Sequence, residues 1–269
     1  SKNSQFLLEG YDNVNDTSKF DNVENYKKKY DEESYDNFYS KYYDSIHLND
    51  DRNKFEIGNL IDIEKKTKHT KVLDVGCGTG YNVNLLDSKN YKAIGLDKSS
   101  AMINNASKKY PDCEFIKGDI LENSVLDYDT FTHIICVGRT IYEIKDKETF
   151  FENCYSLLTT GGYLMINLFD RDKFKPFVQK IDKSIVHDPG NYNMNISKLL
   201  VKFDKNNEYI SKYEKLSLPA NNLLKETVSP YGVYKERFQN FETNAIRDNE
   251  INLYIPELEK IAKLAEDKG

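Results

Sequence analysis

The chain has 269 residues, of which 39% are hydrophobic and 30% charged, and its formal net charge is -6. This length allows one large domain with insertions or two modest ones, and the acidic balance argues against duplex nucleic acid as the main partner, because phosphate contacts need clustered Lys and Arg. No window approaches the roughly twenty apolar residues that span a bilayer, and the four separated cysteines contain no C-x-x-C pair, which indicates a reducing, cytoplasmic setting.

The N-terminal segment, 1–69, is expected to form a helical cap or lid. A helical pattern runs from Val23 to His47, and a second helix is expected over 51–66. Within the first, Tyr35, Tyr39 and Tyr43 are spaced to share one helical face. Such an aromatic face either packs the helix onto a core or approaches a ligand.

Residues 70–170 alternate between short apolar runs and helical segments. Strands are expected at 71–75, 91–97, 113–119, 132–137 and 163–169, with helices between them and two glycines, Gly161 and Gly162, ending the last helix. This alternation predicts an α/β fold with a doubly wound, mostly parallel sheet.

After residue 170 the alternation stops. Segments 195–203, 208–218 and 232–243 are typical of antiparallel strands with one solvated face, so 171–250 is expected to be an inserted antiparallel subdomain that faces the substrate. The remaining residues, 251–269, are expected to be a helix returning to the core, with Pro256 near its start.

The stretch "VLDVGCGTGYN" from Val72 to Asn82 carries the main functional signal. Three alternate glycines directly after an acidic residue exceed what a tight strand-to-helix turn requires. The spacing differs from the G-x-G-x-x-G dinucleotide fingerprint, which disfavours a nicotinamide oxidoreductase. It resembles the first motif of the class I S-adenosylmethionine (SAM) dependent methyltransferases, and the supporting landmarks extend over roughly Lys71 to Asp170.

This resemblance implies SAM as the cofactor and a set of residues that bind it. Asp97 matches the acidic residue on the ribose hydroxyls, Met102 the apolar residue packed on the adenine, and Asp119 the acceptor for the adenine amino group. The complete predicted cofactor site is Asp74, Gly76, Cys77, Gly78, Gly80, Asp97, Lys98, Met102, Gly118, Asp119, Ile120 and Val137.

The acceptor side is expected to involve the N-terminal helix and the loop after the fourth core strand. "YDNFYSKYYD" (Tyr35–Asp44) resembles the opening helix of small-molecule methyltransferases, including sugar N-methyltransferases. The predicted substrate-binding residues are Tyr35, Tyr39 and Arg139, the last suited to an anionic group, and the candidate catalytic residues are His187, Tyr142 and Glu143. No His/Cys/Asp/Glu spacing indicates a metal site.

The sequence therefore predicts a methyltransferase that acts on a small polar, anionic or sugar- or nucleotide-linked intermediate, for example in carbohydrate biosynthesis. A protein or RNA methyltransferase and a non-catalytic SAM-binding subunit remain as alternatives. In that family a closing antiparallel hairpin normally follows the last helix, whereas the chain here stops at "AEDKG". Either those strands are missing or strands of the insert replace them. An uncovered sheet edge could pair with a second copy, so the chain is expected to be a monomer or a homodimer.

Overall fold

The computed structural model describes residues 26–63, 66–122, 125–171, 196–203, 205–216 and 230–269. These residues form two compact units, and each unit contains its own five-stranded sheet. The first unit holds β1 and strands β7 to β10. The second begins at Asp31, continues through β6 and ends with the last two residues of β10 and helix α7.

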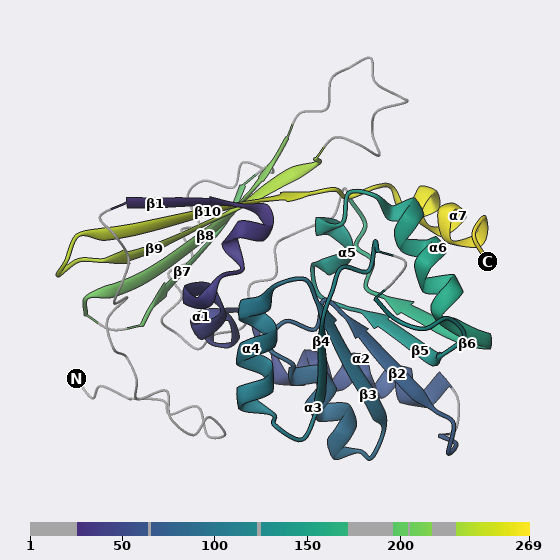
Figure 1. Cartoon of the computed structure of the whole chain (residues 1–269). Coiled ribbons are helices and arrows are strands. Elements are labelled where there is room, and N and C mark those ends of the chain that lie inside the picture. Colours follow the sequence, from purple (N-terminus) through teal and green to yellow (C-terminus); the bar gives the residue numbers. More distant parts are fainter. Residues whose placement is uncertain (1–25, 64–65, 123–124, 172–195, 204, 217–229) are drawn as a thin grey trace. The chain divides into compact units, whose positions relative to one another are not determined.

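The second unit contains a parallel sheet with strand order β4-β3-β2-β5-β6 (Figure 1). Its strands are β2 (Lys71–Val75), β3 (Lys92–Asp97), β4 (Glu114–Lys117), β5 (Phe131–Cys136) and β6 (Leu158–Ile166). Strand β2 pairs with β3 on one side and with β5 on the other. The order therefore reverses at β2, and in open α/β sheets ligands bind beyond the carboxyl end of the strands at this point. The predicted doubly wound α/β core is confirmed.

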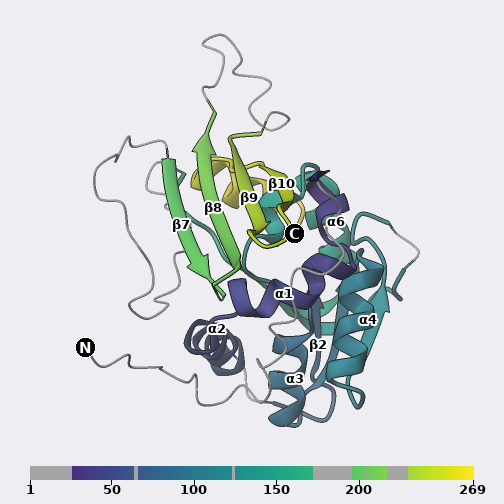
Figure 2. The ribbon, with the colours of Figure 1, turned by 90° about the vertical axis from the view of Figure 1, so that its left-hand side faces the viewer.

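Helices cover both faces of this sheet. They are α1 (Asn37–His47), α2 (Asp50–Ile63), α3 (Tyr81–Ser88), α4 (Ser100–Lys109), α5 (Thr140–Glu143), α6 (Lys147–Leu157) and α7 (Leu258–Glu266). Right-handed crossovers put α3 and α4 on one face and α6 on the other. Helix α2 packs beside α3, α1 beside α4, and α7 beside α6 (Figures 1 and 2).

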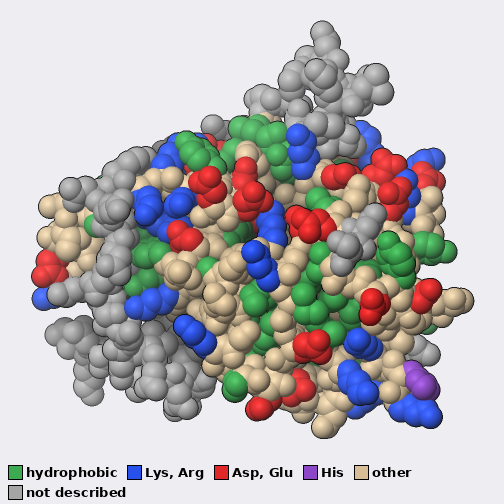
Figure 3. Space-filling model, in the orientation of Figure 1, with side chains coloured by type: hydrophobic (Ala, Val, Ile, Leu, Met, Phe, Trp, Pro, Cys, Tyr) green, Lys and Arg blue, Asp and Glu red, His purple; other side chains and the backbone are tan. Residues whose placement is uncertain are grey.

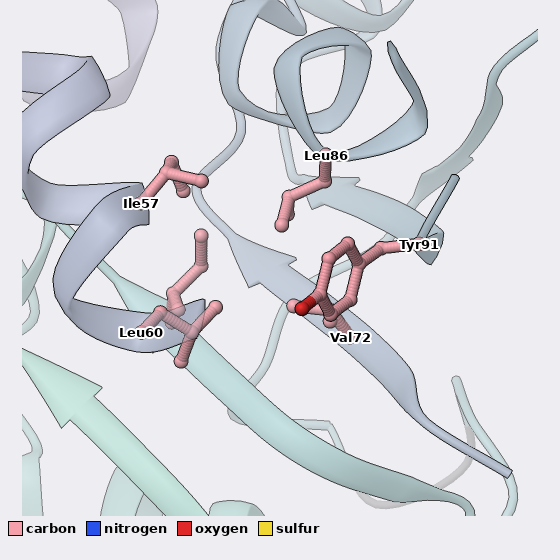
Figure 4. Packing of buried hydrophobic residues seen from close by; sticks show 6 residues of the cluster. Ile57, Leu60, Val72, Leu86 and Tyr91 are labelled. Carbon is pink, nitrogen blue, oxygen red and sulfur yellow. The ribbon is translucent and has the colours of Figure 1, made fainter. Parts of the chain in front are cut away.

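One apolar cluster fastens α2 and α3 to the sheet (Figure 4). Ile57 and Leu60 of α2 meet Leu86 of α3 over Val72 of β2, and Tyr91 closes the cluster beside the start of β3. Because helices bury both faces of a parallel strand, β2 is apolar almost throughout, with only Asp74 breaking the run. That carboxyl lies at the end of the sheet where the glycine run begins.

The first unit is a sheet with strand order β1-β10-β9-β8-β7, whose last four strands run side by side in Figure 2. Its strands are β1 (Tyr26–Tyr30), β7 (Ile196–Lys202), β8 (Asn207–Lys215), β9 (Gly232–Asn240) and β10 (Ala245–Leu253). Burial alternates along β8, β9 and β10, so one face is buried and the other partly solvated, as predicted. The buried face carries Glu236, which accepts hydrogen bonds from Tyr209 and Asn249.

Four points of the sequence analysis need correction. The helix expected from Val23 to His47 is wrong in its first half, because Tyr26–Tyr30 form β1 and α1 begins only at Asn37. Strand β6 starts at Leu158, before the two glycines expected to precede it, and strand β10 was not predicted. The strands after residue 195 form a sheet with β1 and do not extend the parallel sheet, so the suggestion that they replace the closing strands is wrong.

No helix among the described residues is both long and apolar enough to cross a bilayer. The predicted division into 1–69, 70–170, 171–250 and 251–269 stays a prediction.

Candidate functional site

The glycine loop between β2 and α3 requires glycine for geometric reasons. Gly76, Gly78 and Gly80 all have positive φ, at 70°, 54° and 84°. A Cβ on Gly76 would lie 2.4 Å from Cγ2 of Thr140, and one on Gly80 would lie 2.6 Å from the ring of Phe115. The loop is thus held in a left-handed conformation with its backbone close to its neighbours.

Asp97, at the end of β3, holds this loop in place. Its Oδ2 accepts a hydrogen bond from the Gly78 N–H at 2.9 Å, and its Oδ1 accepts one from the Ser99 N–H at 2.8 Å. Burial raises the pKa of Asp97, while these two N–H groups oppose that rise. Each carboxylate oxygen can accept a further hydrogen bond, so Asp97 retains the capacity to receive two ligand hydroxyls.

Asp74 lies in the sheet directly before the glycine loop and is buried. Burial raises the pKa of Asp74 to about 8, with a further contribution from the charge of Asp97, while a hydrogen bond with Asn82 opposes the rise. Its Oδ2 has no hydrogen-bond partner. A buried acceptor without a donor is costly, so this oxygen marks a place where a ligand donor would be stabilising.

The residues predicted to surround an adenine lie beyond the ends of β3 and β4. Met102 is a buried residue of the first turn of α4, whose N-cap Ser99 accepts a hydrogen bond from the Met102 N–H. Asp119 uses Oδ1 to accept from the Leu121 N–H at 3.0 Å. A pocket opens beside Asp119, and its lining includes Ile120, Leu96, Val125 and Leu157. Gly118 approaches Val125 so closely that a Cβ there would clash with its methyl group.

The side chains of three predicted cofactor residues make contacts within the protein. The Sγ of Cys77 lies against Gly95, 2.7 Å from where a Cβ would stand, so this side chain fills the sheet surface and does not face the loop's open side. Val137 packs against the α2–α3 core cluster. The Lys98 side chain is half exposed and forms an ion pair with Glu32 at 2.9 Å. The predicted contacts of these three residues with the cofactor stay predictions.

Helix α1 brings its aromatic face onto the glycine loop. Its N-cap Asp36 accepts hydrogen bonds from the Phe38 and Tyr39 N–H groups. The rings of Tyr35, Tyr39 and Tyr43 stack in edge-on or tilted pairs, with centroids 5.4 Å apart for the first two. Tyr43 lies over Gly78, with Cε1 3.6 Å from where a Cβ would stand. The helix also anchors itself through Asp44, which bonds to the Thr79 hydroxyl and to Lys109.

The predicted acceptor residues divide into a polar cluster and two packed tyrosines. The Tyr35 hydroxyl donates to the Glu143 carboxylate, 2.7 Å from each oxygen, and Arg139 lies 3.4 Å from both Glu143 and the Tyr35 oxygen. Burial and the charge of Glu143 raise the pKa of Tyr35. The Tyr39 hydroxyl is bonded to His47 and the ring is fully buried.

Tyr142 is also buried. Its hydroxyl donates to the Asn167 carbonyl and accepts from the Phe169 N–H, so it ties α5 to the segment after β6. His187 lies outside the described residues. Among the residues that are described, no group of three or more His, Cys, Asp or Glu side chains is arranged to hold a metal ion.

The sequence analysis did not predict a role for the polar residues of α2. Asn53 and Glu56 are buried, on the same side of the helix as Ile57 and Leu60. Asn53 donates to Asn82 of α3 at 2.7 Å, and Glu56 accepts from Asn167 at 2.5 Å. The available signal was an amide and a carboxylate at the spacing of the helix's apolar face, where a purely structural helix would carry hydrophobic residues.

Comparisons with known proteins agree with this geometry. A family model described as a methyltransferase domain matches residues 66–230. A protein of Mycolicibacterium smegmatis named a probable S-adenosylmethionine-dependent methyltransferase is 27% identical over 105 residues, which are 39% of this chain and 40% of that protein. A trans-aconitate 2-methyltransferase of Klebsiella pneumoniae is 32% identical over 102 residues, 37% of this chain and 39% of that protein. The match thus spans about 40% of the length of each of these two relatives.

A solved structure extends the likeness to most of the chain. It is the sugar N-methyltransferase KedS8 from Streptoalloteichus sp., with a TM-score of 0.60 and 14% sequence identity, and the match covers 86% of this chain and 83% of that one. At this level of identity the likeness concerns the fold.

Proposed function

Since this chain belongs to the methyltransferase domain family, we propose that it transfers the methyl group of SAM to a small polar acceptor. The family match confirms the resemblance predicted from Val72–Asn82 and, with it, SAM as the cofactor. The single observation that carries the proposal is the hydrogen-bonded unit formed by Asp97 and the glycine loop, at the end of the sheet where the strand order reverses.

The residues of the site fit SAM. The loop carries no side chains at Gly76, Gly78 and Gly80, so a ligand can approach its backbone. Asp97 can accept from two ribose hydroxyls. The unpartnered oxygen of Asp74 provides a buried acceptor for the positively charged end of the molecule. Asp119, beyond the end of β4, is the predicted acceptor for the adenine amino group, and Met102 of α4 is the predicted apolar contact of its ring. When bound, SAM supplies an electrophilic methyl group on its sulfonium.

The chain's own residues must hold the acceptor, exclude water and receive a proton where the acceptor carries one. The rings of Tyr35 and Tyr43 exclude water above the loop, and a ring close to a sulfonium adds cation–π attraction. Glu143 is the described carboxylate best placed to receive a proton, because Tyr35 and Arg139 fix its position. Tyr142 is less suited, since both of its hydroxyl's bonds go to the backbone. The role of His187 stays a prediction.

A small acceptor is favoured over a macromolecule. Two similar proteins are named for small polar acceptors, a tricarboxylic acid in one case and a sugar amine in the other. Acidic and basic side chains are interspersed on the face shown in Figure 3, with no large field of one sign there, whereas an RNA partner needs a basic patch. Because Arg139 is paired with Glu143, an acceptor that combines a carboxylate or phosphate with a hydroxyl or amine fits both. The cytoplasmic setting and the monomer or homodimer state stay predictions.

The proposal is tested by calorimetric titration of SAM into the wild type, Asp97→Asn and Asp112→Asn, the last an exposed acid that serves as control. We expect micromolar binding to the wild type, at least about a tenfold loss in Asp97→Asn from the lost loop anchor and ribose contacts, and no change in the control. Absence of binding to the wild type would overturn the proposal. Carboxylic acids and amino sugars are then screened for S-adenosylhomocysteine release, and SAM binding without turnover of either class would favour the non-catalytic alternative.

A further inference from the structure

Three buried oxygen atoms near the glycine loop have no hydrogen-bond partner. They are Oδ1 of Asn53, Oε2 of Glu56 and Oδ2 of Asp74, and their residues are 7%, 8% and 1% exposed. All three atoms are acceptors, and a donor group lies beside one of them, since Nε of Arg52 is 3.7 Å from Oε1 of Glu56. Each such acceptor costs about 1–3 kcal/mol when nothing donates to it. Three such acceptors at the proposed cofactor site would be stabilised by a ligand that brings hydrogen-bond donors or positive charge.

The three residues belong to one network that joins α2, β2 and α3. Asn53 donates to the Asn82 side-chain oxygen at 2.7 Å, and Asn82 in turn bonds to Asp74. The charge of Glu56 acts on Asp74 directly. The network therefore couples a carboxyl of the sheet to a carboxyl of the helix packed against it.

Asp74 faces mainly negative neighbours, whereas Glu56 contacts one positive side chain, Arg52. Asp74 faces Asp97 from β3, Cys136 from β5, Cys77 from the loop, Asn82 from α3 and Glu56 from α2. Glu56 faces Asn167 and Arg52, whose Nε lies 3.7 Å from its Oε1. Burial raises the pKa of Glu56 as well as that of Asp74. Near neutral pH, without a ligand, the pair therefore retains a proton.

We propose that the Asp74–Glu56 pair releases a proton when the positively charged methionyl end of the cofactor binds, so that cofactor affinity rises with pH. The inference rests on the proposed function, because it takes SAM as the ligand. The physical reason is that a nearby opposite charge favours the ionised carboxylate. Ligand binding and proton binding are linked reciprocally, so a ligand that expels a proton binds more tightly as protons become scarce.

The size of the effect follows from the value for Asp74. With a pKa of about 8, the unliganded group is about 0.9 protonated at about pH 7, and the bound state is ionised. SAM binding then releases about 0.9 proton at that pH, and its Kd falls about tenfold between about pH 6 and about pH 7. In this range the ligand's own amino group stays largely charged, because α-amino groups titrate near 7.7–8.0.

Stability of the unliganded protein changes in the opposite direction. The folded-state pKa of Asp74 is raised from 3.8 to about 8. The contribution of Asp74 to the free energy of unfolding is therefore fully present below the pKa of 3.8 and is lost as pH rises through the folded-state pKa of about 8. The increase in melting temperature caused by saturating SAM should therefore grow between about pH 6 and about pH 8. This gives a readout independent of turnover.

The deciding experiment is calorimetric titration of SAM in pairs of buffers that differ in ionisation enthalpy. The slope of the apparent binding enthalpy against the buffer's ionisation enthalpy gives the number of protons released. Wild type and the control Asp62→Asn, an exposed carboxyl at the end of α2, should both release close to one proton. Asp74→Asn should abolish the release and Glu56→Gln should reduce it. Adenosine, which lacks both positive charges, should bind without proton release.

The outcomes separate the two proposals. SAM binding to the wild type with no proton release overturns this inference and leaves the proposed function standing. Release that persists unchanged in both Asp74→Asn and Glu56→Gln also overturns it. Failure of SAM to bind at any pH overturns the proposed function itself. If both variants fail to fold, the proton count and the pH dependence of Kd in the wild type alone decide.

Discussion

Individual glycines fix the shape of the cofactor loop more tightly than any side chain does. Gly76 combines a positive φ with the close approach of Thr140, the first residue of α5. Two separate costs therefore meet any replacement there: the strain of a left-handed backbone with a Cβ, and overlap with a side chain held in a helix.

Gly76→Ala should destabilise the protein by about 2–5 kcal/mol, the sum of about 1–2 kcal/mol of backbone strain and about 1–3 kcal/mol of overpacking. Denaturant unfolding measures the change. Gly58→Ala is the matched control, because Gly58 lies inside α2 with open space around it and should gain about 0.5–1 kcal/mol. Adding Thr140→Ala to Gly76→Ala should recover only the stability lost through overlap with the Thr140 side chain, and the loss from backbone strain should remain. Full restoration or none would contradict this division.

Helix α1 is the element that connects the N-terminal part of the second unit to the cofactor loop. Its N-cap, Asp36, satisfies two N–H groups of the first turn. Its interior residues reach the loop through Tyr43 and Asp44. The stability of its first turn and the position of Tyr35 are therefore linked.

Asp36→Ala should cost about 1 kcal/mol of stability, within the usual range of about 0.5–2 kcal/mol for a lost cap. Fraying of the first turn should also loosen Tyr35 from Glu143, so the KM for the acceptor should rise more than the Kd for SAM. Asn37→Ala, one residue further and exposed, serves as the control and should change neither value. Loss of stability without any change in acceptor KM would contradict the assigned link between α1 and Glu143.

At the scale of elements, the sequence revealed what is encoded locally. Strands β2, β3 and β5 are short runs rich in apolar residues, and the first two lie next to glycines and acids, so their positions could be predicted. The role of Asp97 stays a prediction. The residues of β1 could not, because "YKKKY" has the spacing of the helix that follows it and becomes a strand only by pairing with β10. Asn53 and Glu56 were missed for the same reason: their meaning depends on Asn82 and Asn167, which are distant in sequence.

At the scale of the whole molecule, the two units differ in which proposed site residues they contain. Every described residue assigned to the cofactor site lies in the second unit, whereas β1 belongs to the first. Strand β1 pairs with β10 in parallel from Tyr26↔Ile246 to Tyr30↔Glu250, and Lys28 adds an ion pair to Glu250.

The double variant Lys27→Pro/Lys28→Pro should remove β1 from the sheet, because consecutive prolines eliminate at least one ladder N–H in the edge strand. Protease susceptibility of the first unit should increase, while the Kd for SAM should stay within about twofold, because the cofactor residues lie in the other unit. Lys27→Ala/Lys28→Ala controls for the lost charges. A large loss of SAM affinity in the proline variant alone would show that the units are not independent in this respect.

The pairing of β1 with β10 also has a consequence for the order in which the protein is made. Lys29 and its partner Asn249 are 220 positions apart (249 − 29), and at about 5–20 residues per second the first waits on the order of 10–40 s for the second. The entire parallel sheet is synthesised during that interval. The parallel sheet and every described residue assigned to the cofactor site can therefore be in place before β10 and α7 are made, and a nascent chain halted before β10 should already respond to SAM.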